Sequence, residues 1–279
     1  MLRRRGAVAV ALAGALGAWP AVAQAATGPV RVPFRLAPEV GYAVHADGFG
    51  EPRGLLVSPA GDLYVADQKR NEVVRIVRDG RREVVARDVM GAHDIAMDPA
   101  GTLYVAAAAR SQVVKVTPQG VVTVYLDGLA GPVDLAFHPQ GELLVCELAS
   151  DTVRAFASPR QSRVFVRAEG PHGLAFTRDG ITLVAENAAG RILRVHPDGR
   201  TERLAEGLRG PVGIALGPSG DLYVAEPPAG RLSRIRPDGT RQTVAEGLID
   251  PRDPAFDAYG QLFVAETGTG RVLRFTGDF

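Results

Sequence analysis

The apolar residues of this chain lie in short segments that recur at a fixed interval. Residues 63–67 read Leu-Tyr-Val-Ala-Asp, and an apolar segment at residues 54–57 precedes them across a Pro/Gly turn. Similar five-residue segments recur about every 40 residues, at 103–107, 143–147, 182–186, 222–226 and 262–266. Two apolar segments joined by such a turn are typical of an antiparallel hairpin. The pattern therefore predicts six copies of one hairpin.

A third segment follows each hairpin and alternates apolar with charged residues, as a half-buried strand does. These segments are residues 73–77, 113–116, 153–156, 192–195, 232–235 and 272–275. A turn such as Pro197-Asp198-Gly199 then leads to a fourth apolar segment. Four antiparallel strands per repeat of about 40 residues predict an all-β protein, a six-bladed β-propeller of four-stranded blades.

The last copy ends after its third strand, and residues 42–49 resemble residues 242–248, the fourth strand of the preceding copy. We therefore expect an N-terminal strand to complete the C-terminal blade, which would remove two unpaired edges. The predicted single domain spans residues 39–279. Its blades are expected at 50–89, 90–129, 130–169, 170–208, 209–248, and 249–279 together with 39–49.

The N-terminus has the features of a secretory signal. Arg3, Arg4 and Arg5 precede an apolar run at residues 7–19, and small residues suitable for cleavage lie near Ala23 to Ala26. No later run reaches the roughly 18 apolar residues of a membrane span. We expect a signal peptide at residues 1–26, an N-terminal extension at 27–38, and a periplasmic or secreted monomer.

Composition narrows the range of partners. Thirty-two Lys and Arg residues oppose 31 Asp and Glu residues, a net charge of +1, so nothing favours nucleic acid or an anionic membrane surface. The single cysteine, Cys146, lies in an apolar segment, which predicts a core residue and excludes an internal disulfide or a cysteine zinc cluster. No nucleophile-elbow, zincin or phosphate-loop motif is present.

The Leu-Tyr-Val-Ala-Asp/Glu segments with their Pro-x-Gly hairpins resemble NHL repeats. From Val40 onward, the chain is similar to the gluconolactonase-like and virginiamycin B lyase-like superfamily of six-bladed propellers. The resemblance implies the fold. It leaves the function open, since such propellers include lactonases, lyases and modules that only bind partners.

In such propellers the inner strands start at one face of the disc, so the residues at their starts meet at a central mouth. Four of these residues depart from the repeat: Arg53, His93, His172 and Arg252. Arg53 and Arg252 belong to adjoining blades, where two guanidinium groups suit a carboxylate or phosphate. The alternative is ion pairing with Asp67, Glu266 or Asp253. Ala107, where other blades carry an acid, is expected to open space beside His93.

The family resemblance also implies a metal site. His172 with Glu186 is similar to the histidine and glutamate pattern by which virginiamycin B lyases hold a divalent cation, so a Ca, Mg or Zn ion is a possible cofactor. The lyase pattern also has Glu-x-His where this chain reads Arg209 to Gly213. The lactonase metal ligands are likewise replaced, at Arg53, His172 and Val212.

Five of the six second strands end in an acid, and a residue repeated in this way is expected to cap loops rather than to serve one site. The sequence thus leaves three functions open, one of which is a rigid scaffold for protein contacts in the periplasm. The mouth binds a small anionic ligand or a protein partner through Arg53, His93, His172 and Arg252. Alternatively, the protein is a divalent-metal-dependent lyase or hydrolase acting on a small substrate, with His93 and His172 as its catalytic candidates.

Overall fold

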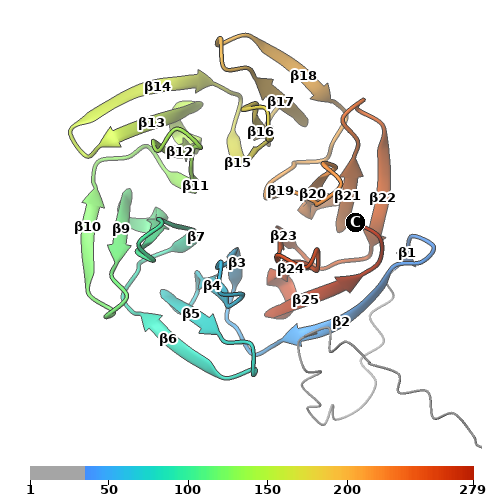
Figure 1. Cartoon of the computed structure of the whole chain (residues 1–279), viewed down its shortest axis with the longest axis horizontal. Coiled ribbons are helices and arrows are strands. Elements are labelled where there is room, and N and C mark those ends of the chain that lie inside the picture. Colours follow the sequence, from blue (N-terminus) through green and yellow to red (C-terminus); the bar gives the residue numbers. More distant parts are fainter. Residues whose placement is uncertain (1–34) are drawn as a thin grey trace, which may run out of the picture.

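The computed structural model describes residues 35–279; the expected signal peptide and most of the N-terminal extension lie outside this range. Six antiparallel sheets surround a central axis, with their innermost strands at the centre and their outer strands at the rim (Figure 1). This confirms the predicted six-bladed β-propeller. No helix in the described part of the chain is long and apolar enough to cross a membrane.

The blades follow one another along the chain. Blade one comprises β3 (Pro52–Val57), β4 (Leu63–Asp67), β5 (Glu72–Ile76) and β6 (Arg82–Ala86). Blade two comprises β7 (Ala92–Met97), β8 (Leu103–Ala107), β9 (Gln112–Val116) and β10 (Val122–Leu126). Blade three comprises β11 (Pro132–Phe137), β12 (Leu143–Glu147), β13 (Thr152–Ser158) and β14 (Gln161–Arg167). Blades four and five comprise β15 (Pro171–Phe176), β16 (Thr182–Glu186), β17 (Arg191–Val195) and β18 (Thr201–Ala205), then β19 (Ile214–Leu216), β20 (Leu222–Glu226), β21 (Arg231–Ile235) and β22 (Arg241–Glu246).

Blade six contains strands from both ends of the described chain. Its strands are β23 (Pro251–Phe256), β24 (Leu262–Glu266), β25 (Arg271–Thr276) and β2 (Gly41–Ala46). β2 pairs antiparallel with β25, with Tyr42 opposite Phe275. The sequence pattern missed a further strand: β1 (Arg35–Leu36), within the expected extension, pairs with β22 and adds a fifth strand to blade five.

Within residues 35–279, four short 3-10 helices follow second strands: η1 (Ala108–Arg110), η2 (Leu148–Ser150), η3 (Pro227–Ala229) and η4 (Thr267–Thr269). The apolar core lies between the faces of neighbouring blades. Between blades six and one, for example, Leu63 and Val65 pack against Phe263, all three fully buried. Cys146 is buried in the corresponding core between blades three and four, as predicted.

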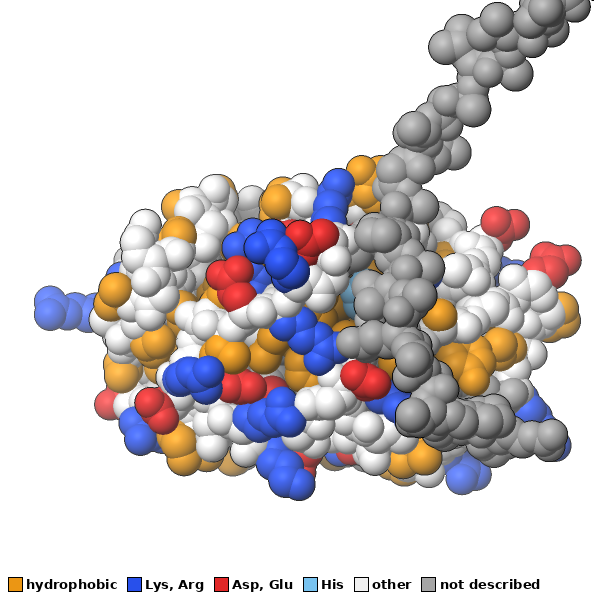
Figure 2. Space-filling view, turned by 90° about the horizontal axis from the view of Figure 1, so that it is seen from below, with side chains coloured by type: hydrophobic (Ala, Val, Ile, Leu, Met, Phe, Trp, Pro, Cys, Tyr) orange, Lys and Arg blue, Asp and Glu red, His pale blue; other side chains and the backbone are white. Residues whose placement is uncertain are grey.

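The rim of the disc carries charges of both signs. Seen edge-on in Figure 2, Lys and Arg side chains are interspersed with Asp and Glu side chains and with apolar side chains. No surface of a single charge dominates this view, in keeping with the net charge of +1.

Candidate functional site

The four predicted site residues meet at the centre of the disc. Arg53 and His93 lie near the starts of β3 and β7, and His172 and Arg252 near those of β15 and β23. All four line one recess on the propeller axis. The ring centroids of His93 and His172 are 5.3 Å apart, although the two residues come from blades two and four.

The two arginines do not pair with the carboxylates considered as alternatives. Arg53 forms an ion pair with Glu51 at 3.8 Å, and Arg252 forms one with Asp250 at 2.9 Å. Both partners precede their arginine by two residues, at the edge of the mouth. The Nε atoms of Arg53 and Arg252 are buried and have no hydrogen-bond partner among the described residues. The two arginine side chains remain 17% and 23% exposed, so each guanidinium group can also donate to a ligand at the mouth.

The electrostatics of the mouth favour an anion. Burial lowers the pKa of Arg53, and the positive charge of Arg252 lowers it further. Burial also lowers the pKa of His172 to about 4, with Arg252 and Arg53 contributing. The pKa of His93 lies well below its usual value, first because of burial and then because of His172 and Arg53. At neutral pH two arginine cations therefore stand beside two neutral imidazoles.

Three carboxyl groups that sequence reasoning did not assign also line the recess: Asp94, Asp134 and Asp253. Burial raises the pKa of Asp94 to about 7. Burial also raises the pKa of Asp134 and Asp253 well above the usual range, and the proximity of Asp94 adds to this. Because these groups tend to keep their protons, they do little to neutralise the arginines.

These aspartates join neighbouring blades. Asp253 accepts a hydrogen bond from the Leu55 amide of blade one at 2.7 Å, and Asp94 accepts one from the Leu135 amide of blade three at 3.2 Å. The corresponding position in blades one, four and five is glycine. At Gly213 a Cβ atom would lie 2.4 Å from Asp253 Oδ1, so a side chain there would collide with the next blade. The sequence signal was the division at this position between Asp in blades two, three and six and Gly in the other three.

The recess itself is small. Its volume of about 20 Å³ holds about one water molecule and no organic ligand. A ligand of the mouth therefore lies above the ring formed by the arginines and histidines. Ala107, expected to open space beside His93, is instead buried in the apolar core between blades.

The second-strand acids cap loops, as their repetition predicted. Asp67 accepts hydrogen bonds from the amides of Gly50 and Glu51, at 2.7 and 3.0 Å. Glu226 accepts one from the Arg209 amide at 2.7 Å, and Glu266 one from the Ile249 amide at 3.0 Å.

The predicted pair for a metal, His172 and Glu186, is not arranged as a metal centre. Glu186 accepts hydrogen bonds from the Glu169 amide and from the Arg191 guanidinium group. Within residues 35–279, no three His, Cys, Asp or Glu side chains are grouped so that they could hold a metal ion. The cations of Arg53 and Arg252 near His172 also oppose a metal ion. The described residues therefore do not fit the divalent cation that the family resemblance implies.

Comparison with protein families identifies the chain. Residues 41–278 match the virginiamycin B lyase family. The chain belongs to this family. Comparison with curated proteins gave no match.

Solved structures confirm the fold. Virginiamycin B lyase from Staphylococcus aureus superposes with a TM-score of 0.65 at 16% identity, covering 87% of this chain and 99% of that one. A gluconolactonase from Xanthomonas campestris superposes with a TM-score of 0.77 at 16% identity, covering 87% and 91%. At such identity the likeness extends to the propeller alone.

Proposed function

We propose that the central mouth binds a small anionic ligand, a carboxylate, through Arg53 and Arg252. The observation that carries this proposal is the pair of guanidinium groups from adjoining blades at the mouth, each of which has a single protein carboxylate as its ion-pair partner among the described residues and remains partly exposed. The neutral imidazoles of His93 and His172 add hydrogen-bond donors and acceptors without repelling an anion. An acidic loop of a protein partner would offer the same carboxylate.

A thermal-shift panel tests this proposal. Acetate, succinate, citrate and phosphate are added to the mature protein and to Arg53→Gln, Arg252→Gln and Arg110→Gln. Arg110, exposed in η1, is the matched control. Because a charge-assisted hydrogen bond contributes about 1.5–3 kcal/mol, either mouth variant is expected to weaken binding roughly tenfold or more. Equal stabilisation of all four proteins by every anion would contradict the proposal.

A second candidate function is lyase or hydrolase chemistry on a small substrate. It is favoured by family membership and by two neutral imidazoles, because a neutral imidazole carries a ring nitrogen that can accept a proton. Quinupristin, named with a virginiamycin B lyase structure, is the substrate to try, with and without Mg²⁺. A new chromatographic peak that His172→Ala abolishes would support this candidate. Unchanged quinupristin would argue against streptogramin cleavage.

We further propose that the protein acts outside the cytoplasm, as residues 1–26 of the sequence indicate. N-terminal sequencing of the protein purified from a periplasmic fraction tests this. The expected first residue lies near Ala23 to Ala26, whereas recovery of an intact Met1 from the cytoplasm alone would contradict export.

A further inference from the structure

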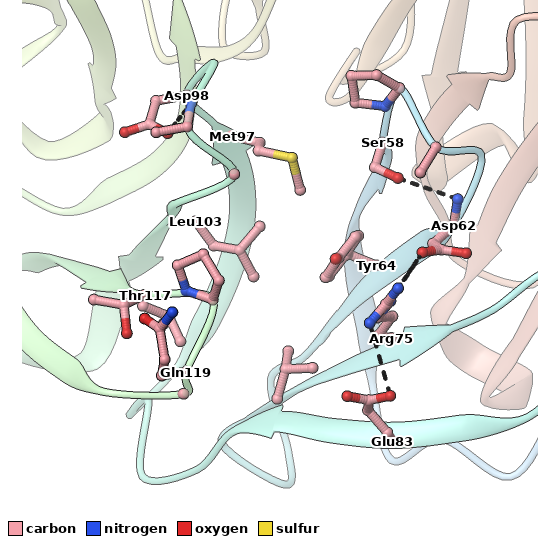
Figure 3. Close-up of a pocket in the computed structure, with 18 of the residues that line it drawn as sticks. Ser58, Asp62, Tyr64, Arg75, Glu83, Met97, Asp98, Leu103, Thr117 and Gln119 are labelled. Atoms are coloured by element: carbon pink, nitrogen blue, oxygen red, sulfur yellow. Dashed lines mark hydrogen bonds and ion pairs between the residues drawn. The ribbon is translucent and has the colours of Figure 1, made fainter.

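A large groove lies on the face of the disc opposite the mouth, between blades one and two. It has a volume of about 710 Å³. We call it the blade 1–2 groove. Its walls are the turn at residues 58–62, part of β6, and the blade-two turns at 98–101 and 117–120. Figure 3 shows Tyr64 and Met97 facing each other across it, with Arg75 held between Asp62 and Glu83.

At two other blade junctions an aromatic ring fills the corresponding space. The position of Val85 on the outer strand of blade one is Tyr125 in blade two and Phe165 in blade three. The Tyr125 ring packs 4.9 Å from Tyr104, and the Phe165 ring packs 5.9 Å from His138. Valine is too small to replace such a ring. The blade 1–2 groove is therefore open because its own blade lacks the filling side chain.

Blade five also carries a valine here, Val244, but an added segment of the chain fills the space. β1 pairs along β22 with Leu36 opposite Ala245, and the Ala37 amide donates to the Val244 carbonyl oxygen at 2.9 Å. Leu36, Val40 and Phe279 pack against the core there. In Figure 1 β1 lies beside β22 at the outer edge of blade five.

The blade 1–2 groove and the space covered by β1 at blade five are lined by corresponding residues. Tyr64, Arg75 and Val85 in blade one match Tyr223, Arg234 and Val244 in blade five, and both arginines pair with an aspartate. The aromatic rings differ in exposure, because Tyr223 packs against Phe279 and is fully buried whereas Tyr64 is only partly buried. The outer strand β22 is covered by β1, while β6 is an edge strand. Blade one thus presents the same site without its occupant.

We propose that the blade 1–2 groove binds an extended segment of a partner protein, which adds a strand along β6 and inserts an aliphatic side chain where Leu36 lies in blade five. Main-chain hydrogen bonds to an exposed sheet edge are a recurrent mode of peptide recognition, and side-chain pockets give it specificity. The empty volume at Gly120, which corresponds to Phe279, accommodates an aromatic side chain as well.

Charge determines which segment fits. In blade five, Arg35 of the added strand lies opposite Glu246. The residue of blade one that corresponds to Glu246 is Arg87, whose side chain is 70% exposed and lies 3.2 Å from Glu72. A segment beginning with arginine would place two cations opposite each other. The partner segment therefore has an acidic residue before its aliphatic one, which disfavours the Arg35 segment of a second copy.

Two acetylated hexapeptides serve as probes in NMR titrations of the isotope-labelled protein, followed at the Tyr64 and Val85 amides. One is Arg-Leu-Ala-Pro-Glu-Val, the sequence of residues 35–40, and the other has Glu in place of the Arg. Since cross-strand charge pairs contribute about 0.2–1 kcal/mol, the parent is expected to bind the Glu peptide about two- to fivefold more tightly. Arg87→Glu should reverse this preference.

Val85→Tyr provides the blocking control, because it introduces the ring that fills the groove in blade two. It should abolish binding of both peptides while leaving the melting temperature unchanged or raised. Absence of binding to the parent, equal affinity for the two peptides, or unchanged binding to Val85→Tyr would each overturn the proposal.

Discussion

The second-strand acids and the mouth arginines differ in how far their polar atoms are paired within the protein. Glu226 accepts hydrogen bonds from the Arg209 amide, from Arg231 and from Ser233, so both of its carboxylate oxygens have partners. Arg53 and Arg252 each have one peripheral carboxylate and an unpartnered Nε among the described residues. The first arrangement has no capacity left for a ligand. The two arginines can still bind a ligand, and they lie at positions where the sequence departs from the repeat.

The largest effect is expected from removing one of the capping acids. Glu226→Ala leaves Arg231 and the Arg209 amide without their acceptor, and breaking a buried ion pair in this way costs about 3–5 kcal/mol. The melting temperature, measured by thermal denaturation, should fall by roughly 6–20 °C. Glu202→Ala is the control, because Glu202 pairs with Arg194 while 50% exposed, and it should change the melting temperature little. Equal effects of the two substitutions would refute the capping role.

A smaller effect should come from giving blade two the acid that it lacks. Ala107→Glu buries a carboxylate without an arginine, since Gln112 occupies the place of Arg231, and is expected to cost about 2–3 kcal/mol. The double variant Ala107→Glu/Gln112→Arg recreates the pair and should recover part of that loss in denaturant unfolding. Absence of any recovery would show that the two positions do not couple.

The smallest expected effect concerns the buried carboxyls and depends on pH. The pKa of Asp94 is raised from 3.8 to about 7, so the folded protein binds this proton more tightly than the unfolded chain does. Its contribution is present below pH 4 and is lost as the pH rises towards 7. Asp94→Asn removes this loss and keeps an acceptor for the Leu135 amide. The full shift corresponds to about 4 kcal/mol at pH 8, and burying the Asn amide NH₂ without an acceptor offsets about 1–3 kcal/mol of it. The variant should therefore melt on the order of 5 °C above the parent at pH 8, with a smaller difference at pH 5.

His172 changes the pH dependence of stability in the opposite direction over part of the same pH range. Its pKa is lowered to about 4, so stability is lost as the pH falls from 6.5 through 4. The comparison of Asp94→Asn with the parent at each pH cancels this term. A pH-independent difference between the two proteins would show that Asp94 does not carry a raised pKa.

The sequence predicted the features that follow from the repeat, namely the fold, the position of the mouth and the capping acids. Because equivalent residues recur in each blade, aligning the copies located Arg53, His93, His172 and Arg252 at one mouth and identified Asp67 and its equivalents as caps. Two features were not accessible in this way. The roles of Asp94, Asp134 and Asp253 depend on contacts between blades, which only the closed ring shows. β1 contains two residues, too few for a period-2 pattern.

The blade 1–2 groove was missed for a different reason. Its volume depends on the size of a single outer-strand side chain, Val85 against Tyr125 or Phe165, and both choices are ordinary strand residues. Valine, tyrosine and phenylalanine give the same strand pattern in the sequence, but their side chains fill different volumes between the blades.

Calorimetric titration of succinate into the mature protein, with Arg53→Gln, Arg252→Gln and Glu202→Ala measured alongside, is the most direct test of the anion site at the mouth. We expect saturable binding to the parent and to Glu202→Ala, and at least a tenfold loss of affinity in each mouth variant with an unchanged melting temperature. Binding of equal affinity in all four proteins, or the absence of binding to the parent by every anion of the panel, would contradict an anion site at the mouth.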